Sequence, residues 1–200
     1  DARRVRLDLR WHEDGRLTGA STDTLVGQEA IVVGATLAQL DAARRPRLVE
    51  RLLLPAVGAA QVESFADPIE DDPDGPLTMR SRFVVQGGDQ LALGLAPVSP
   101  GRSHARLADR ALPLALDLPT HQTVHLVLES DRPFTGAPSD VTLTWGPHRF
   151  TRRVEVDDDR VEIHSELVVA GGLIAPEDYP AFAKWARQVD AAERFTLVAR

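Results

Sequence analysis

The sequence predicts an α+β protein that is built mainly of antiparallel strands. Apolar and polar residues alternate over many short segments, three stretches have helical periodicity, and glycine or proline separates most segments. We expect residues 1–100 to form a small sheet with a helical pair. We expect residues 104–200 to form a β-sandwich-like unit closed by a C-terminal helix, although both halves could share one sheet in a single continuous domain.

The first half opens on a strand, because apolar residues occupy every second position from Val5 to Trp11. Glu13-Asp14-Gly15 is typical of a hairpin turn, since glycine accepts a positive φ. A polar return strand follows over about Arg16–Thr24. Its low apolar content indicates a strand at a sheet edge or one that faces solvent.

A helical pair comes next, with apolar residues on one helical face over Ala30–Leu40 and again over Leu48–Leu53. Pro46 suits the first turn of the second helix, and Pro55 is expected at its end. Three further strands are predicted over Gln61–Ala66, Leu77–Val85 and Gln90–Leu95. A boundary between the two halves is expected at Ala96–Arg106, because this segment holds two prolines and a glycine.

The second half contains alternating strands around Val124–Leu128 and Val141–Trp145 and a long hairpin, Phe150–Val156 with Val161–Val169, whose tip is Asp157-Asp158-Asp159. The register of this hairpin predicts cross-strand charge pairs, which would join Arg152 and Arg153 to Glu162, His164 and Glu166.

A helix over about Pro176–Glu193 and a last strand over Phe195–Val198 close the chain. Tyr179, Phe182 and Trp185 lie at helical spacing. This stripe is either a partner-binding face or the side that packs on the sheet, and we expect packing because aromatic residues are few in this chain.

The composition excludes several kinds of catalytic and binding site. The chain has no cysteine, which excludes a thiol nucleophile, a zinc-thiolate site and a disulfide. Its formal net charge of -7 argues against nucleic acid as a partner. No apolar run reaches the ~20 residues of a membrane span, so we expect no membrane insertion by this chain. The chain begins with Asp1 rather than methionine, and we therefore expect it to be part of a longer protein.

We predict no catalytic, cofactor-binding or metal-ligating residues. Of the six histidines, His121 and His125 are four apart on a strand, which separates them by about 13 Å and prevents them from sharing a metal. The acidic segment Asp71–Gly75 resembles a calcium loop, but the twelfth position is Arg82 rather than glutamate, so a solvated turn is expected. No G-x-S-x-G motif supports a serine nucleophile.

The segment Gly172–Phe182, continued to Val189–Glu193, resembles the C-terminal region of large bacterial transglutaminase-like proteins. The order of Val5–Trp11, Glu13-Asp14-Gly15 and Gly27-Gln28-Glu29-Ala30 is similar to the stretch that follows the papain-fold core in those proteins. The resemblance implies that a Cys-His-Asp core would lie upstream of Asp1. None of its catalytic residues transfers to this chain, which has no cysteine.

The expected function is that of a non-catalytic accessory region or scaffold. Its partner would be an upstream transglutaminase-like core, which it would pack on or position, or another protein. The resemblance implies a periplasmic or envelope-associated location. Two other classes stay open: a free-standing binding module for carbohydrate or protein, which would need exposed aromatics such as Trp11 or Trp145, and an enzyme in its own right with paired carboxylates or a metal.

Overall fold

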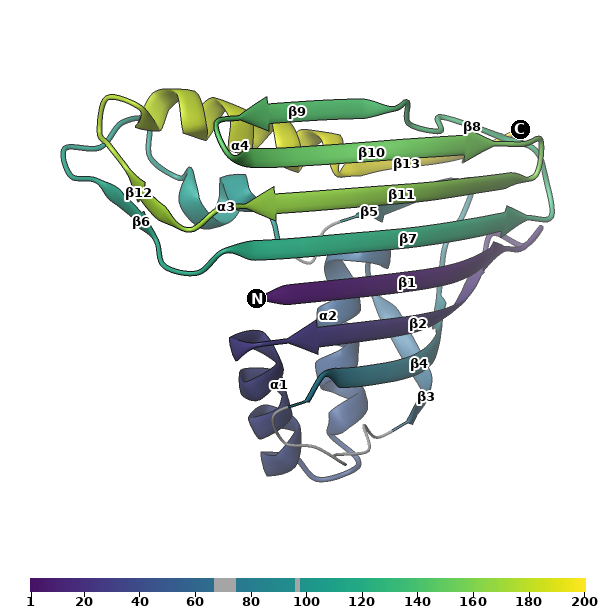
Figure 1. Ribbon diagram of the computed structural model, residues 1–200. Coiled ribbons are helices and arrows are strands. Elements are labelled where there is room, and N and C mark those ends of the chain that lie inside the picture. Colours follow the sequence, from purple (N-terminus) through teal and green to yellow (C-terminus); the bar gives the residue numbers. More distant parts are fainter. Residues whose placement is uncertain (67–74, 96–97) are drawn as a thin grey trace.

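Residues 1–66, 75–95 and 98–200 are described by a computed structural model (Figure 1). The elements within these ranges follow the chain as β1 (Ala2–Trp11), β2 (Leu17–Val26), α1 (Gln28–Gln39), α2 (Arg45–Val57), β3 (Ala60–Ala66), β4 (Leu77–Val85), β5 (Gln90–Gly94), α3 (Pro100–His104), β6 (Leu114–Leu116), β7 (Thr120–Ser130), β8 (Phe134–Thr135), β9 (Val141–Trp145), β10 (His148–Val156), β11 (Arg160–Val169), β12 (Gly172–Ile174), α4 (Tyr179–Ala192) and β13 (Arg194–Ala199).

The fold is mixed α+β with a large sheet in which antiparallel pairs predominate, as the sequence predicts. The eight strands of this sheet lie in the order β3-β4-β2-β1-β7-β11-β10-β9. β1 and β2 form the predicted hairpin, and Gly15 at its turn has a φ of 82°, a conformation that favours glycine. At the centre of the sheet, β1 and β7 pair in parallel over ten residues, from Ala2↔His121 to Trp11↔Ser130.

The central parallel pair joins the two predicted halves in one sheet. β1 comes from the range 1–100 and β7 from the range 104–200, and their inward side chains, Leu7 and Leu126 among them, belong to the same core cluster. This is the single-sheet arrangement that the sequence left open beside two domains.

One face of the large sheet is covered, and Figure 1 shows the helices on that side only. α2 and the three-stranded sheet β5-β13-β8 pack on the central strands, with Leu53, Leu93 and Leu197 in the same cluster as Leu7 and Leu126. α1 packs on β2 and β4, and α4 covers the sheet near β9. The three-stranded sheet gives the molecule its sandwich-like second layer.

The predicted aromatic stripe of α4 is the packing side of the helix. Tyr179 and Phe182 are 0% exposed and Trp185 is 3% exposed. Phe182 contacts the rings of Trp145, His148 and Trp185, with centroids 5.5–5.8 Å apart. Trp145 is half-buried against this cluster. These aromatic contacts anchor α4 on the sheet.

The position of β2 differs from the edge position that the sequence allowed, because β2 lies inside the sheet between β1 and β4. Its inward polar residues are satisfied by partners. Ser21 hydrogen-bonds Ser81 over 2.7 Å, and Asp23 accepts two hydrogen bonds from buried Arg3. Arg3 also binds Glu29 in the first turn of α1 at 2.8 Å, so this buried ion pair ties the helix to the sheet.

Pro55 lies inside α2 rather than at its end. The helix continues to Val57, which is 2% exposed, and closes where the amide of Gly58 donates to the carbonyl of Leu54 at 3.1 Å. The burial of Val57 offsets the one hydrogen bond that proline cannot donate. The short elements β6, β8, β12 and α3 were not predicted, since two to five residues are too few to establish a period.

None of the helices in the described ranges combines the length and the hydropathy needed to cross a lipid bilayer.

Phe182→Ala tests the packing of α4. The change empties a fully buried site among three aromatic rings, and we expect it to lower the free energy of unfolding by about 3–5 kcal/mol. Urea denaturation followed by tryptophan fluorescence measures this loss. Lys184→Ala, on the exposed side of the same helix, is the control, and equal effects of the two substitutions would contradict the packing described here.

Candidate functional site

The outer face of the large sheet carries the candidate site, because strand alternation places its polar side chains there. On β1, the odd positions Arg3 to Leu9 face the covered side, while Arg4, Arg6 and Asp8 are exposed on the other side. The same alternation along β7, β10 and β11 leaves threonine, histidine, arginine and glutamate outside. No helix covers this face in the described part of the chain (Figure 1).

Cross-strand register sorts these side chains into rows that run across the strands. The basic row follows the pairs of β4, β2, β1, β7, β11 and β10 and consists of Arg80, Thr22, Arg6, His125, His164 and Arg153. The threonine row lies on one side of it and consists of Thr78, Thr24, Arg4, Thr123, Glu166 and Thr151. The acidic row lies on the other side and consists of Asp8, Val127, Glu162 and Glu155 on β1, β7, β11 and β10; on β2 and β4 the same register continues with Ala20 and Arg82.

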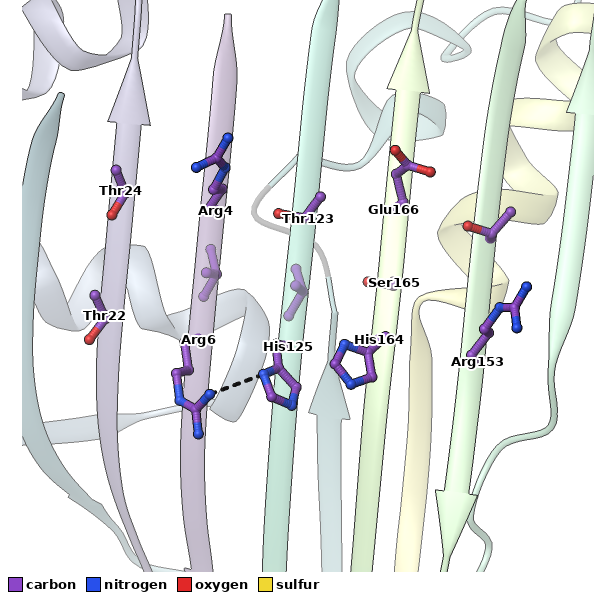
Figure 2. A pocket seen from close by; sticks show the side chains of 13 residues that line it. Arg4, Arg6, Thr22, Thr24, Thr123, His125, Arg153, His164, Ser165 and Glu166 are labelled. Carbon is purple, nitrogen blue, oxygen red and sulfur yellow. Dashed lines mark hydrogen bonds between the residues drawn. The ribbon is translucent and has the colours of Figure 1, made fainter.

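A hollow of about 480 Å³ lies over the basic and threonine rows, between β2 and β10. Figure 2 shows its walls: Arg4 and Arg6 project from β1, His125 from β7, His164 from β11 and Arg153 from β10. The lining is rich in hydroxyl groups and guanidinium groups. It contains one carboxylate, that of Glu166, which is paired with Arg149 at 2.7 Å and with His121 at 2.9 Å.

The cations of this hollow differ in their partners. Arg6 binds Asp8 through two hydrogen bonds of 2.8 Å. Arg4 and Arg153 are exposed and make no ion pair with any described residue. They flank the hollow three strands apart, a separation of about 14 Å at ordinary strand spacing. Two unpaired guanidinium groups therefore face solvent on either side of the hollow.

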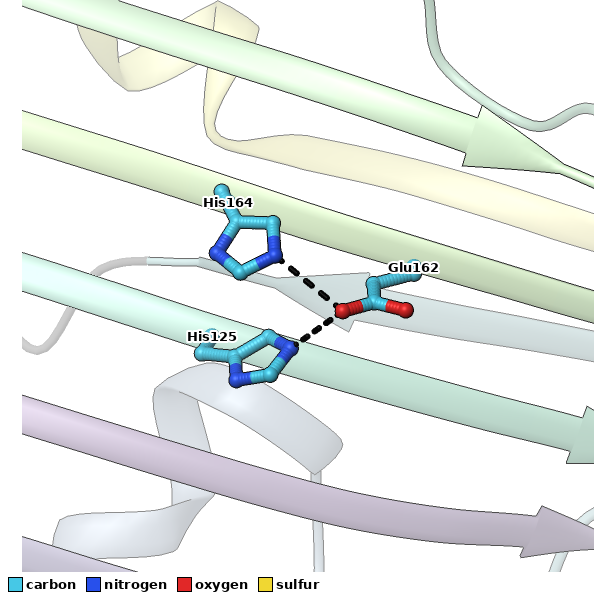
Figure 3. A group of neighbouring side chains, drawn as sticks. All are labelled: His125, Glu162 and His164. Carbon is cyan, nitrogen blue, oxygen red and sulfur yellow. Dashed lines mark hydrogen bonds and ion pairs between the residues drawn. The ribbon is translucent and has the colours of Figure 1, made fainter.

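His125, Glu162 and His164 form a cluster at the edge of the hollow (Figure 3). Oε1 of Glu162 lies 2.7 Å from Nε2 of His125 and 3.1 Å from Nε2 of His164, and Arg160 binds Oε2 of the same carboxylate. The two imidazole rings stack with centroids 4.1 Å apart and 17° between their planes. Three donors thus converge on one carboxylate.

These donors hold the pKa of Glu162 down to about 2, with the hydrogen bond from His125 as the largest cause and that from Arg160 next. Arg6 donates to Nδ1 of His125 at 3.2 Å, which fixes the tautomer because a guanidinium can only donate. Nδ1 is therefore the acceptor, and Nε2 carries the proton that it donates to Glu162.

The cluster is better suited to hydrogen bonding than to binding a metal ion. A metal on Nε2 of His125 would require the proton on Nδ1, which would then face the Arg6 donor. One candidate ligand atom from each of the three side chains lies within 4.8 Å of the others. The Nε2 atoms of both histidines already hydrogen-bond Glu162, so a metal ion would have to replace these bonds.

No site residue was predicted from the sequence, so the cluster of His125, Glu162 and His164 was not foreseen. It was correct that His121 and His125 do not come together, since His121 pairs with Glu166. The position of His164 directly opposite His125 was not predicted, because no local sequence pattern specifies that β7 pairs with β11. The available signal was the alternation of Glu162, His164 and Glu166 on one strand and of His121, Thr123 and His125 on another.

The predicted charge pairs of the long hairpin form with other arginines. Arg149 binds Glu166 and Arg160 binds Glu162, while Arg153 has no such partner among the described residues. Arg152 points inward and donates to the carbonyls of Ser139 and Ala192, because alternation puts it on the covered face. Asp157–Asp159 form the loop between β10 and β11, whereas Asp71–Asp74 of the predicted acidic turn lie outside the described residues.

Glu193 is a second unusual carboxyl group, at the end of α4. It is 3% exposed, and its Oε1 has no hydrogen-bond partner among the described residues. Burial, and after it the nearby charge of Asp190, raises the pKa of Glu193 to about 9, against the opposing effect of Arg194. Glu193 is therefore protonated at neutral pH.

We expect Glu162→Gln to remove a pH-dependent part of the stability. A carboxyl whose folded pKa is about 2 stabilises the fold above pH 4.5, and this contribution is lost as the pH falls toward 2. Urea denaturation should show a gap between wild type and variant that is full at pH 6 and narrows toward pH 3. Glu13→Gln, at an exposed turn, should show no such change, and a constant gap for Glu162→Gln would contradict the cluster.

Glu193→Gln should change stability in the opposite sense. A folded pKa of about 9 means that the unfolded chain loses its proton first, so the wild type loses stability as the pH rises from 4.5 to 9. The stability of the variant relative to the wild type should therefore increase between pH 5 and pH 8. Thermal unfolding at pH 5 and pH 8 measures this difference, with exposed Glu177→Gln as control. A difference that does not grow with pH would exclude a buried neutral carboxyl.

Comparisons with protein-family models, with curated proteins and with solved structures find no match to this chain.

Proposed function

We propose that this chain is a non-catalytic scaffold, whose outer sheet face docks on a partner protein. The observation that carries the proposal is the order of the charged side chains on the uncovered face: a basic row crosses six strands, and Asp8, Glu162 and Glu155 lie beside it on β1, β11 and β10. A mainly antiparallel sheet commonly leaves one face in water, so exposure alone would not indicate a partner. Neighbouring rows of opposite charge offer a partner protein complementary contacts.

The resemblance of the C-terminal segment to transglutaminase-like proteins suggests the identity of this partner. We propose that the partner is a papain-fold core in the same gene product, which this chain packs on or positions. In this arrangement the scaffold contributes no nucleophile, in keeping with the absence of cysteine from the chain.

The structure supports a carbohydrate-binding module less well than a scaffold that docks on a protein. Sugar platforms use exposed aromatic rings, and no phenylalanine, tyrosine or tryptophan side chain among the described residues is exposed. Trp11 is 0% exposed, and Trp145 packs in the α4 cluster.

The structure also supports an enzyme less well than a non-catalytic scaffold. A general acid needs a carboxyl with a raised pKa that substrate can reach. The pKa of exposed-face Glu162 is lowered, and Glu193, whose pKa is raised, is buried.

Protection of the outer face in the complete gene product tests the proposal. Because the chain has no cysteine, Thr123→Cys places one thiol on the outer face of this region, and Gln188→Cys places one on the exposed side of α4. Maleimide labelling of each thiol is measured by peptide mass spectrometry in the isolated chain and in the complete product. We expect labelling at position 123 to slow severalfold in the complete product and labelling at position 188 to stay unchanged.

Equal labelling rates at position 123 in the two proteins would contradict docking of this face in the gene product. A complete reading frame without Cys, His and Asp in papain-like order would remove the transglutaminase-like core as the partner. Turnover by the isolated chain that a single carboxylate or histidine substitution abolishes would establish an enzyme instead.

A further inference from the structure

The basic row stands out in an acidic protein. The chain has a formal net charge of -7, yet this row places three arginines and two histidines on six adjacent strands, with Thr22 between Arg80 and Arg6. At ordinary strand spacing the row is about 24 Å long. The arginines at its two ends, Arg80 and Arg153, are exposed and make no ion pair with any described residue.

We propose that the basic row binds an extended acidic segment of polypeptide, which crosses the strands along the row. This inference rests on the proposed function, because it takes the same outer face to be the docking surface, and it names the chemistry of what docks there. A span of about 24 Å corresponds to roughly seven residues of extended chain. Carboxylates of such a segment would meet Arg80, Arg6 and Arg153, and Arg4 would reach them from the neighbouring row.

The flanking rows limit the ligand to the width of one chain. On one side, over β1, β11 and β10, the carboxylates of Asp8, Glu162 and Glu155 disfavour an anion, although Asp8 and Glu162 are themselves paired with Arg6 and Arg160. On β4 the same row continues with Arg82, so this limit acts only on the β1 to β10 part of the face. On the other side, the hydroxyl groups of Thr24, Thr123 and Thr151 can bond the amides and carbonyls of a peptide backbone. The stripe of charge and the adjacent hydroxyls therefore suit a polypeptide.

Other polyanions fit this face less well. Duplex nucleic acid is wide enough to bring its phosphates over the acidic row. Single-stranded nucleic acid binds by stacking its bases on aromatic rings, and the rings that line the hollow among the described residues are the imidazoles of His125 and His164, which already stack on each other. A sulfated sugar chain is anionic along its whole length and offers no backbone amides to the threonine row.

The histidine cluster contributes to the row by positioning. His125 and His164 are held against Glu162, and Arg6 is held between Asp8 and Nδ1 of His125. Arg6 is thus partly neutralised by Asp8, while Arg4, Arg80 and Arg153 make no ion pair with any described residue and keep their full charge for a ligand. We therefore expect these three arginines to carry most of the affinity, and the test substitutes Arg4 and Arg153, which line the hollow.

The test uses the isolated chain and a fluorescent octapeptide of alternating glutamate and serine, with binding followed by fluorescence anisotropy. We expect saturable binding that weakens as salt is added. Arg4→Glu with Arg153→Glu should raise the Kd about tenfold or more, since two attractive contacts become repulsive. The octapeptide of alternating glutamine and serine should not bind.

The matched control is Arg47→Glu with Arg51→Glu on α2, where both arginines are exposed and make no ion pair with the described residues. It changes the net charge by the same amount on the covered side of the molecule, and the Kd should stay at the wild-type value. Equal weakening by the two double variants would show that only net charge matters and would overturn the proposal.

Two rival probes complete the design: an octamer of deoxythymidine and a sulfated oligosaccharide of similar length. Tighter binding of either than of the acidic peptide would overturn the assignment of a polypeptide ligand. If the peptide fails to bind while the thiol at position 123 is protected in the complete gene product, the acidic-segment inference fails and the docking function stands. If the peptide binds and that thiol is unprotected, docking within the gene product fails and the acidic-peptide site stands.

Discussion

The parallel pairing of β1 with β7 is the constraint on which the rest of the structure depends. It joins strands that are more than a hundred residues apart and sets both faces of the sheet at once. On the inner face it brings Leu7 beside Leu126 in the largest core cluster. On the outer face the same register puts Arg6 beside His125 and Arg4 beside Thr123. A shift of one residue would exchange the two faces and destroy both the core and the charge rows.

The two faces of the sheet have different organisation because only one is packed. Inward polar side chains of β1 and β2 are held by specific partners, as in the buried pair of Arg3 with Asp23, since an unpaired charge there would cost several kcal/mol. Outward charges incur no such cost, and their order in rows is not needed for folding. Arg4 and Arg153 are exposed and unpaired among the described residues, so they contribute little to the stability of the fold. We therefore assign these two residues to binding.

Much of the fold could be predicted from the sequence because alternation and turn residues are local signals. The strand from Val5 to Trp11, the hairpin at Gly15 and the apolar side of the C-terminal helix were all predicted in this way. The interior position of β2 was not, because the partners of Ser21 and Asp23 come from other strands. The site was missed for the same reason: His125 and His164 are neighbours only through the pairing of β7 with β11, which depends on tertiary structure.

The central claim is that the outer face of the sheet is a docking surface. An experimental structure of the complete gene product, together with any protein that co-purifies with it in a fixed ratio, tests this most directly. The account predicts that another polypeptide segment lies against Thr123 and Arg153 and presents carboxylates to the basic row. An outer face that stays open to solvent throughout that assembly would contradict it.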